Sequence, residues 1–234
     1  MSKIIIYDFE IFKYDSLLGA MVLEKDGPVI YQTWDEREIR FFYQKHQNDV
    51  WIGWNSFGYD DLILEAIVEG KNAFKKSKEI ITSRFKPKRK MKLYSFDLMN
   101  TGLGKPTSLK LTELISGNAI DTTEVDFNLD RPLTIEERRK TEKYNQSDLN
   151  QTYYNFKMFY DRFSLRVDLI KEFNLDLDQY LNATGTTLAA RALGAKKNES
   201  LKYQLLKPRI YDTLQLKNQN VKKRIFRKNC RRCS

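Results

Sequence analysis

Asp8 and Glu10 are two acidic residues, two positions apart, at the end of an apolar run (residues 4–6) near the N-terminus. Side chains two apart in a β-strand point to the same face, so the two carboxylates would lie side by side. Adjacent carboxylates repel each other, and a divalent cation relieves that repulsion. The pair indicates part of a metal site, with a solvated strand end as the alternative.

Two further groups have spacings suited to the same chemistry. Asn55 and Asp60 are five residues apart, where an apolar run passes through a turn into a helical pattern. Asp60 could equally be a simple helix cap. Tyr144 and Asp148 are four residues apart in a helical segment, so the phenol and the carboxylate would share one face. Local hydrogen bonding is the ordinary explanation for such a pair.

The positive charge of the chain is concentrated in two segments. The net charge is +10, yet residues 71–92 contain ten basic residues and one acid, and residues 217–232 contain eight basic residues and no acid. The rest of the chain is therefore acidic. This distribution favours a polyanionic partner beside an acidic centre that collects metal ions, with solvated charged loops as the alternative.

The composition limits the class of protein and its surroundings. A chain of 234 residues with 41% hydrophobic residues is long enough for one buried domain. No apolar run approaches the roughly 20 residues that span a bilayer, and residues 1–6 do not resemble a secretory signal. We therefore expect no membrane partner and a cytoplasmic protein.

The acidic residues need elements that bring them together. Thr134 and Glu137 form a capping-box pattern that predicts the start of a long helix running past Phe163, with or without a break. Three strands in succession followed by alternating helices and strands predict an α/β fold, with a mixed sheet and helices on both sides. The predicted strands are residues 3–9, 17–24, 28–34, 50–54 and 92–98, and the other predicted helices are 36–46, 60–69, 108–116 and pieces of 165–195.

In order and type, the three groups resemble the motifs of the DEDD superfamily of 3′→5′ exonucleases in its tyrosine form. The resemblance is greatest to the proofreading exonuclease domains of bacteriophage and family B DNA polymerases. It covers about residues 3–160 and rests on residues 7–10, 55–60 and 144–148. It implies an RNase H-like domain over residues 1–164, a helical appendage or polymerase-connecting remnant over 165–215, and a basic tail over 216–234.

The resemblance also implies roles for the individual residues. Asp8 would bridge two Mg²⁺ or Mn²⁺ ions, Glu10 and Asp148 would complete the first ion site, and Asp60 would hold the second. Tyr144 would orient the attacking water, because a phenol with a pKa of about 10 is a poor general base at neutral pH. The residues expected to contact the substrate are Phe9, Asn55 and Tyr59, together with Lys86, Lys88, Arg89 and Lys90 of the basic segment.

The implied activity is hydrolysis from the 3′ end of single-stranded DNA, releasing 5′-mononucleotides as in proofreading. A DNA polymerase subunit is the expected protein partner, and the host cytoplasm is the expected location if the chain is encoded by a phage. The alternatives are a 3′→5′ exoribonuclease and a non-catalytic DNA-binding accessory subunit. No palm motif of the type Asp-Thr-Asp-Ser is present, so we expect no polymerase activity. Asp97, in a predicted buried strand, is assigned to structural hydrogen bonding.

Overall fold

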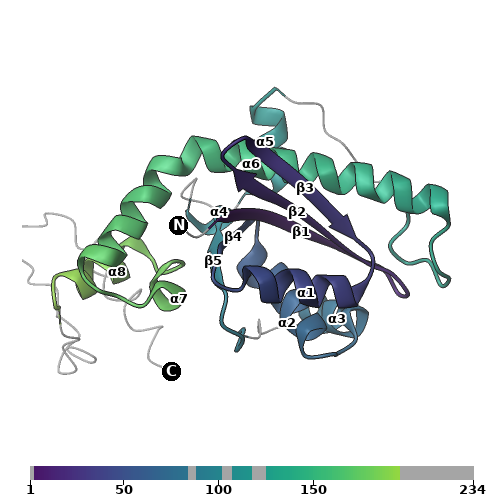
Figure 1. Cartoon of the computed structure of the whole chain (residues 1–234), viewed down its shortest axis with the longest axis horizontal. Coiled ribbons are helices and arrows are strands. Elements are labelled where there is room, and N and C mark those ends of the chain that lie inside the picture. Colours follow the sequence, from purple (N-terminus) through teal and green to yellow (C-terminus); the bar gives the residue numbers. More distant parts are fainter. Residues whose placement is uncertain (1–2, 84–87, 102–106, 118–124, 196–234) are drawn as a thin grey trace, which may run out of the picture. The chain divides into compact units, whose positions relative to one another are not determined.

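The fold is α/β, with one mixed five-stranded sheet flanked by helices, as the sequence predicted (Figure 1). The computed structural model describes residues 3–83, 88–101, 107–117 and 125–195, all within a compact unit that ends at Ala195. The strand order is β3-β2-β1-β4-β5, with antiparallel pairing among the first three strands and parallel pairing of β4 to β1 and to β5. The strands are β1 (Ile4–Ile11), β2 (Ser16–Glu24), β3 (Gly27–Thr33), β4 (Val50–Gly53) and β5 (Tyr94–Asp97).

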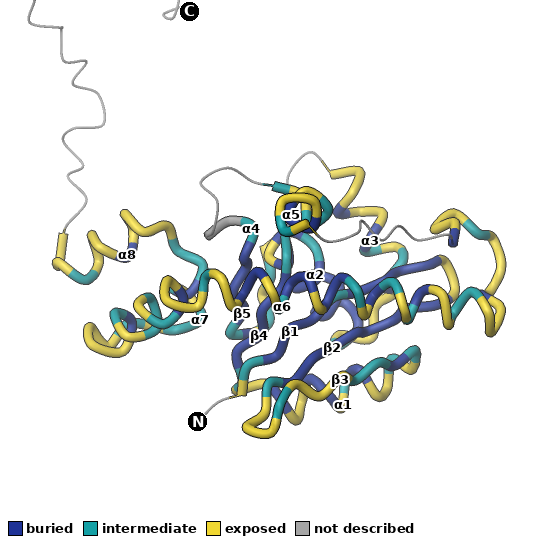
Figure 2. Tube along the Cα trace, turned by 90° about the horizontal axis from the view of Figure 1, so that it is seen from above, coloured by how far each residue is buried: buried dark blue, intermediate teal, exposed yellow. Residues whose placement is uncertain are grey.

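The sheet lies between two helical layers, and its central strands are buried along most of their length (Figure 2). Alternate residues of β1 serve different layers. Tyr7 and Phe9 pack with the helices on one face, whereas Ile6 packs with those on the other. This burial on both faces explains why β1 reads as a nearly continuous apolar run interrupted only by its acidic residues.

Three helices cover the first face of the sheet: α1 (Glu36–His46), α2 (Asp60–Val68) and α3 (Ala73–Thr82). The first two were predicted within one residue of their ends. The third lies within the basic segment and was not predicted. Its buried face consists of Ala73, Ser77 and Ile80. These positions have helical spacing, but the many lysines around them led the segment to be interpreted as a charged loop.

The second face is crossed by one long helix, α6 (Ile135–Glu172), with the short α5 (Leu109–Ile115) beside it (Figure 1). The capping box of Thr134 and Glu137 is present, which confirms the predicted start of α6. The helix continues for 38 residues without a break. The expected domain boundary after residue 164 therefore falls inside a continuous helix.

Two short helices, α7 (Leu177–Tyr180) and α8 (Gly185–Ala192), pack against the C-terminal part of α6, in the region where the sequence predicted helical pieces. Asn182 connects them to the sheet edge: its amide donates to the Ser95 carbonyl at 2.6 Å and accepts from the Asp97 main-chain N–H at 2.8 Å. The side chain thus pairs with β5 as a neighbouring strand would. The remaining elements are η1 (Ser56–Gly58) and α4 (Leu98–Thr101).

Residues 196–215 of the expected appendage and the basic tail over 216–234 lie outside the described residues. Within the described part of the chain, no helix combines the length and the apolar character that crossing a membrane requires.

Candidate metal centre

The carboxylates of Asp8 and Glu10 belong to one cluster with a residue of α6. They therefore lie on the same face of β1, as their spacing predicted. Tyr7 and Phe9 face the opposite layer. Glu10 is buried and Asp8 is partly exposed. The strand therefore carries two carboxylates into a region of low dielectric constant, where unpaired charges are unfavourable.

Helix α6 supplies the third carboxylate. Asp148 is buried, and carboxylate oxygens of Asp8, Glu10 and Asp148 all lie within 4.8 Å of one another. The donors are all oxygen atoms, which are the ligands that hard divalent cations prefer. This buried acidic cluster could hold a metal ion.

Asp60 lies beside the cluster rather than within it. It is the first residue of α2 and is buried, and its carboxylate accepts the Phe9 main-chain N–H at 3.2 Å. Its charge acts on Asp8 and Glu10, which places it close to both. All four acidic residues singled out in the sequence therefore come together at the end of β1.

Burial and mutual repulsion raise the pKa values of these carboxyl groups. Burial, followed by the charge of Asp148, raises the pKa of Asp8 from 3.8 to about 7. Burial raises the pKa of Glu10 well above its usual value, with Asp8 as the next cause. Burial and the charge of Asp8 do the same to the pKa of Asp60. The negative charges are thus poorly neutralised by the protein itself.

Among the described residues, Lys110 brings a positive charge to the cluster, a contact that no motif in the sequence marked. Lys110 of α5 donates to Asp148 at 2.7 Å and to Glu113 at 3.2 Å. Its ammonium group also lies 4.6 Å from the centre of the Tyr144 ring. A lysine one turn from a glutamate on a short helix is a common surface pattern, so nothing in the sequence singled it out.

Tyr144 lies one helical turn before Asp148, and its side chain is partly exposed. Burial, followed by the charges of Asp148 and Glu10, raises the pKa of its phenol well above 10.0. The phenol therefore stays protonated at neutral pH and acts as a hydrogen-bond donor rather than as a base. The predicted role of Tyr144 in orienting water stays a prediction.

Asn145 fixes the position of Asp8, and a glycine makes room for it. Its amide group donates to Asp8 at 2.9 Å and accepts from Gln32 at 3.0 Å. Gly19 pairs with Asp8 across β1 and β2, and a Cβ atom there would lie 1.7 Å from the Asn145 side-chain oxygen. Only glycine lets α6 approach the sheet this closely.

Asp97 organises the loop that leads to Asp60. Its carboxylate accepts the main-chain N–H groups of Asn55 at 2.9 Å and Phe57 at 3.3 Å. Asn55 has a φ of 60°, a left-handed conformation that this residue type tolerates. The assignment of Asp97 to structural hydrogen bonding is confirmed. Asn55 is partly exposed at the start of this loop.

The aromatic residues expected to contact substrate are differently placed. Phe9 is buried and packs edge-on to Tyr7, with 6.4 Å between ring centres, on the face away from the acidic cluster. Its ring is therefore not available to a substrate, although its main chain supports Asp60. Tyr59 is partly buried, and its hydroxyl is hydrogen-bonded to Ser77 at 2.7 Å.

The basic residues expected to guide DNA do not form one group. Lys88 and Lys90 are exposed, whereas Lys86 lies outside the described residues. Arg89 has a side chain only 8% exposed, and it forms ion pairs with Asp61 at 3.3 Å and with Asp178 of α7 at 2.8 Å. The Arg89 guanidinium is therefore a structural group in the interior, not part of a DNA-binding surface.

Asp61 is a second polar centre that the sequence analysis did not identify. It is fully buried, and its carboxylate accepts hydrogen bonds from the Tyr7 hydroxyl and, at 2.9 Å, from the Ser95 hydroxyl. Together with the Arg89 ion pair, these contacts fix the start of α2 against β1 and β5. They hold the segment that carries Asp60.

The sequence matches no known protein family, and no curated protein is significantly similar to it. The function therefore has to be argued from the acidic cluster and its surroundings.

Proposed function

We propose that this protein is a divalent-metal-dependent 3′→5′ exonuclease with an RNase H-like fold, acting on single-stranded DNA. The observation that carries the proposal is the approach of Asp8, Glu10 and Asp148 to within 4.8 Å, with Asp60 beside them. The mixed sheet, with three antiparallel strands followed by two parallel ones, is compatible with that fold. The tyrosine one turn before Asp148 supports the DEDD resemblance.

The residues present fit Mg²⁺ or Mn²⁺. The donor atoms are carboxylate oxygens, and burial and mutual repulsion raise the pKa values of Asp8 and Glu10, which a divalent cation would offset. Asp8, Glu10 and Asp148 would hold one ion, and Asp8 and Asp60 would hold a second. When bound, two such ions supply Lewis-acid activation of water and stabilisation of the leaving 3′ oxygen.

The side chains of the protein contribute positioning and hydrogen bonding. Tyr144, which keeps its proton at neutral pH, donates a hydrogen bond to orient the attacking water. Asn145 holds the Asp8 carboxylate at a fixed angle. Lys110 adds positive charge on the side of Asp148, where the negative charge of a phosphate would approach.

The proposed substrate is a polyanion with a free 3′ end. Exposed Lys88 and Lys90 lie in a strongly basic segment, which suits contact with backbone phosphates. We place their role in affinity rather than in chemistry, because neither belongs to the acidic cluster.

The test is degradation of a 5′-labelled single-stranded DNA oligomer by the full chain with Mg²⁺ or Mn²⁺. We expect a ladder that shortens from the 3′ end, which disappears with a chelator and in an Asp8→Ala/Glu10→Ala variant. Asp26→Ala, which changes an exposed acid in the turn between β2 and β3, is the matched control and should retain full activity.

The same assay separates the alternatives. Faster degradation of an RNA oligomer of the same sequence would identify an exoribonuclease. A folded, metal-loaded protein that binds the oligomer without cleaving either backbone would be a non-catalytic accessory subunit, and the proposal would then be wrong.

A further inference from the structure

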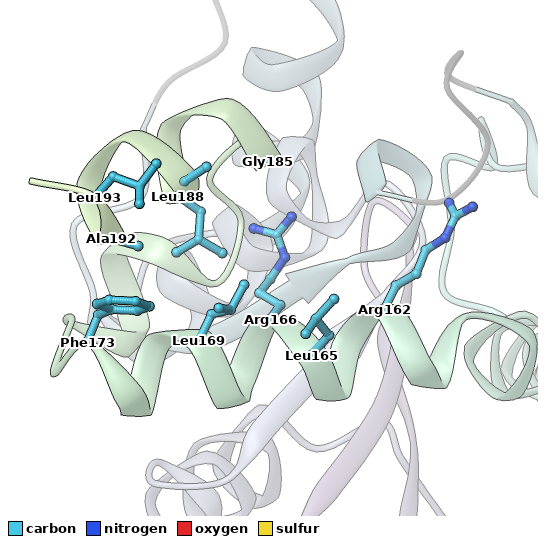
Figure 3. Close-up of a pocket in the computed structure, with 10 residues that line it drawn as sticks. Arg162, Leu165, Arg166, Leu169, Phe173, Gly185, Leu188, Ala192 and Leu193 are labelled. Atoms are coloured by element: carbon cyan, nitrogen blue, oxygen red, sulfur yellow. The ribbon is translucent and has the colours of Figure 1, made fainter. Parts of the chain in front are cut away.

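A groove of about 420 Å³ lies between the C-terminal part of α6 and α8, further along the helix that carries Asp148 (Figure 3). Its walls are mainly apolar, and several of their side chains are strongly exposed: Leu165 of α6 is 60% exposed and Leu193, directly after α8, is 82% exposed. Figure 3 shows the leucines of the two segments on opposite sides of the groove, with Arg166 between Leu165 and Leu169 and Arg162 at one end. A concave surface of this kind is typical of a site that receives apolar side chains.

The charge around the groove is of one sign. Its ten lining residues include Arg162 and Arg166 and no acid. Arg166 is partly buried and donates to the main-chain carbonyls of Tyr180 and Ala183. No carboxylate of the described residues forms an ion pair with the Arg166 guanidinium. Burial without a counter-ion lowers the pKa of this guanidinium, so an added carboxylate would be favourable here.

The charge also distinguishes between occupants. Residues 196–234 of this chain contain thirteen lysines and arginines and only two acids, so the Arg166 guanidinium would repel them. A second copy docking through the same groove would bring like arginines together about a two-fold axis. An acidic partner would be attracted to this groove and would not bring like charges together.

We propose that this groove binds an amphipathic helix of another protein, with large apolar side chains on one face and carboxylates flanking them. The apolar side chains would lie between Leu165 and Leu193, over the buried Leu188, and a carboxylate would pair with Arg166. Recognition of an amphipathic helix in a groove uses apolar anchors at i, i+3 or i+4, and i+7, a spacing that a cleft between two helices accommodates. This site is separate from the proposed nuclease centre, and its occupancy does not depend on cleavage.

The test uses the full chain and three fluorescent helical peptides of about 16 residues, long enough to form a helix when bound. All three share one leucine stripe, and their flanking positions are all Glu, all Gln or all Lys. We expect the affinity to decrease in that order, with the Glu peptide bound about tenfold more tightly than the Lys peptide. Equal affinities, or no binding tighter than about 1 mM, would overturn the proposal.

Variants locate the binding. Leu193→Asp, at an exposed position that folding tolerates, should weaken binding of the Glu peptide about tenfold. Ile81→Asp, at a residue 72% exposed on α3, is the matched control and should have no effect. Arg166→Gln should remove the preference for Glu over Gln. An unchanged affinity in Leu193→Asp would show that the peptide binds elsewhere and that the proposal is wrong.

Two further measurements exclude other occupants. Displacement of the Glu peptide by a synthetic peptide with the sequence of residues 201–217 would assign the groove to this chain itself. Weaker binding of a single-stranded oligonucleotide in Leu193→Asp would assign it to nucleic acid. Either result would overturn the proposal, whereas the absence of both, with the expected order of peptide affinities, supports it.

Discussion

Asp60 and Asp61 are neighbours in the first turn of α2, and both are buried, yet their surroundings are opposite in character. Asp61 receives the hydroxyl groups of Tyr7 and Ser95 and is paired with Arg89. Asp60 receives one main-chain N–H group and faces other carboxylates. One turn of one helix thus contributes one carboxylate to a centre with a paired cation and another to a centre where carboxylates repel each other.

The difference indicates what each centre is for. A buried carboxylate paired with a cation and bonded by hydroxyl groups, such as Asp61, holds elements together and is strongly destabilising when a partner is removed. Buried carboxylates that repel each other, such as Asp8 and Glu10, lower stability until a cation arrives. We therefore expect substitutions near Asp61 to affect folding and substitutions in the acidic cluster to affect chemistry.

The largest expected effect is on catalysis. Asp60→Asn should lower the rate of oligomer degradation at least about a thousandfold, on the order of 4 kcal/mol, because it removes a proposed metal ligand. The free energy of unfolding in chelator should stay the same or rise, since a repelling charge is lost. Single-turnover kinetics and urea unfolding measure the two quantities. A stable variant with normal activity would exclude Asp60 from the site.

Asp61→Ala should lower the stability of the fold rather than catalysis, the reverse of what we expect for Asp60→Asn. Loss of this carboxylate leaves the Tyr7 and Ser95 hydroxyls unpaired and removes one counter-ion of Arg89, so the free energy of unfolding should decrease by about 3 kcal/mol. Asp61→Asn, which keeps an acceptor, should cost less. Urea unfolding is the measurement, and a decrease below about 0.5 kcal/mol for Asp61→Ala would remove the contrast between the two residues.

The pH dependence of stability should show the excess charge directly. Because the pKa of Asp8 in the folded protein is about 7 instead of 3.8, the folded state keeps a proton that the unfolded chain has released between these values. Without divalent cations, stability should therefore be greatest at acid pH and decrease as the pH rises from about 4 to about 7, by on the order of 4 kcal/mol. Saturating Mn²⁺ should reduce this decrease. The measurement is urea unfolding at several pH values, with chelator or with Mn²⁺. A free energy of unfolding that does not change with pH in chelator would contradict the expectation.

The smallest expected effect concerns the one cation that contacts the cluster from α5. Lys110→Met removes an ammonium group that competes for Asp148, so Mn²⁺ should bind about fivefold more tightly, near 1 kcal/mol. Titration calorimetry measures the affinity. Lys157→Met, which changes an ammonium group lying over the Tyr153 ring, is the control and should leave the affinity unchanged. Weaker binding in Lys110→Met would mean that the lysine supports the site instead of competing for it.

The sequence predicted the strands and the acidic residues because these depend on local patterns. The period of two in β1 puts Asp8 and Glu10 on one face, and the helical spacing in α6 puts Tyr144 and Asp148 together. That the two pairs meet was implied only by the DEDD resemblance. The capping box predicted the start of α6 for the same reason.

The features that escaped the sequence analysis depend on long-range contacts. Lys110 and Arg89 are ordinary basic residues until the fold brings one to Asp148 and the other to Asp61. Phe9 lies within a motif, yet the strand alternation that aligns Asp8 with Glu10 turns its ring away from them. Gly19 has no side chain to suggest a role, and only the approach of Asn145 reveals it.

Helix α6 runs without a break from the acidic cluster to the groove and so fixes the distance between them. Asp148 and Leu165 are separated by about 26 Å along the helix axis, at a rise of about 1.5 Å per residue, with no hinge between them. A protein held in the groove would therefore be kept at a fixed spacing and a fixed angle from the acidic cluster. Inserting about seven residues, close to two turns, would lengthen the spacing by about 10 Å and nearly preserve the angle. Inserting about two residues would turn the groove toward the other side of the helix.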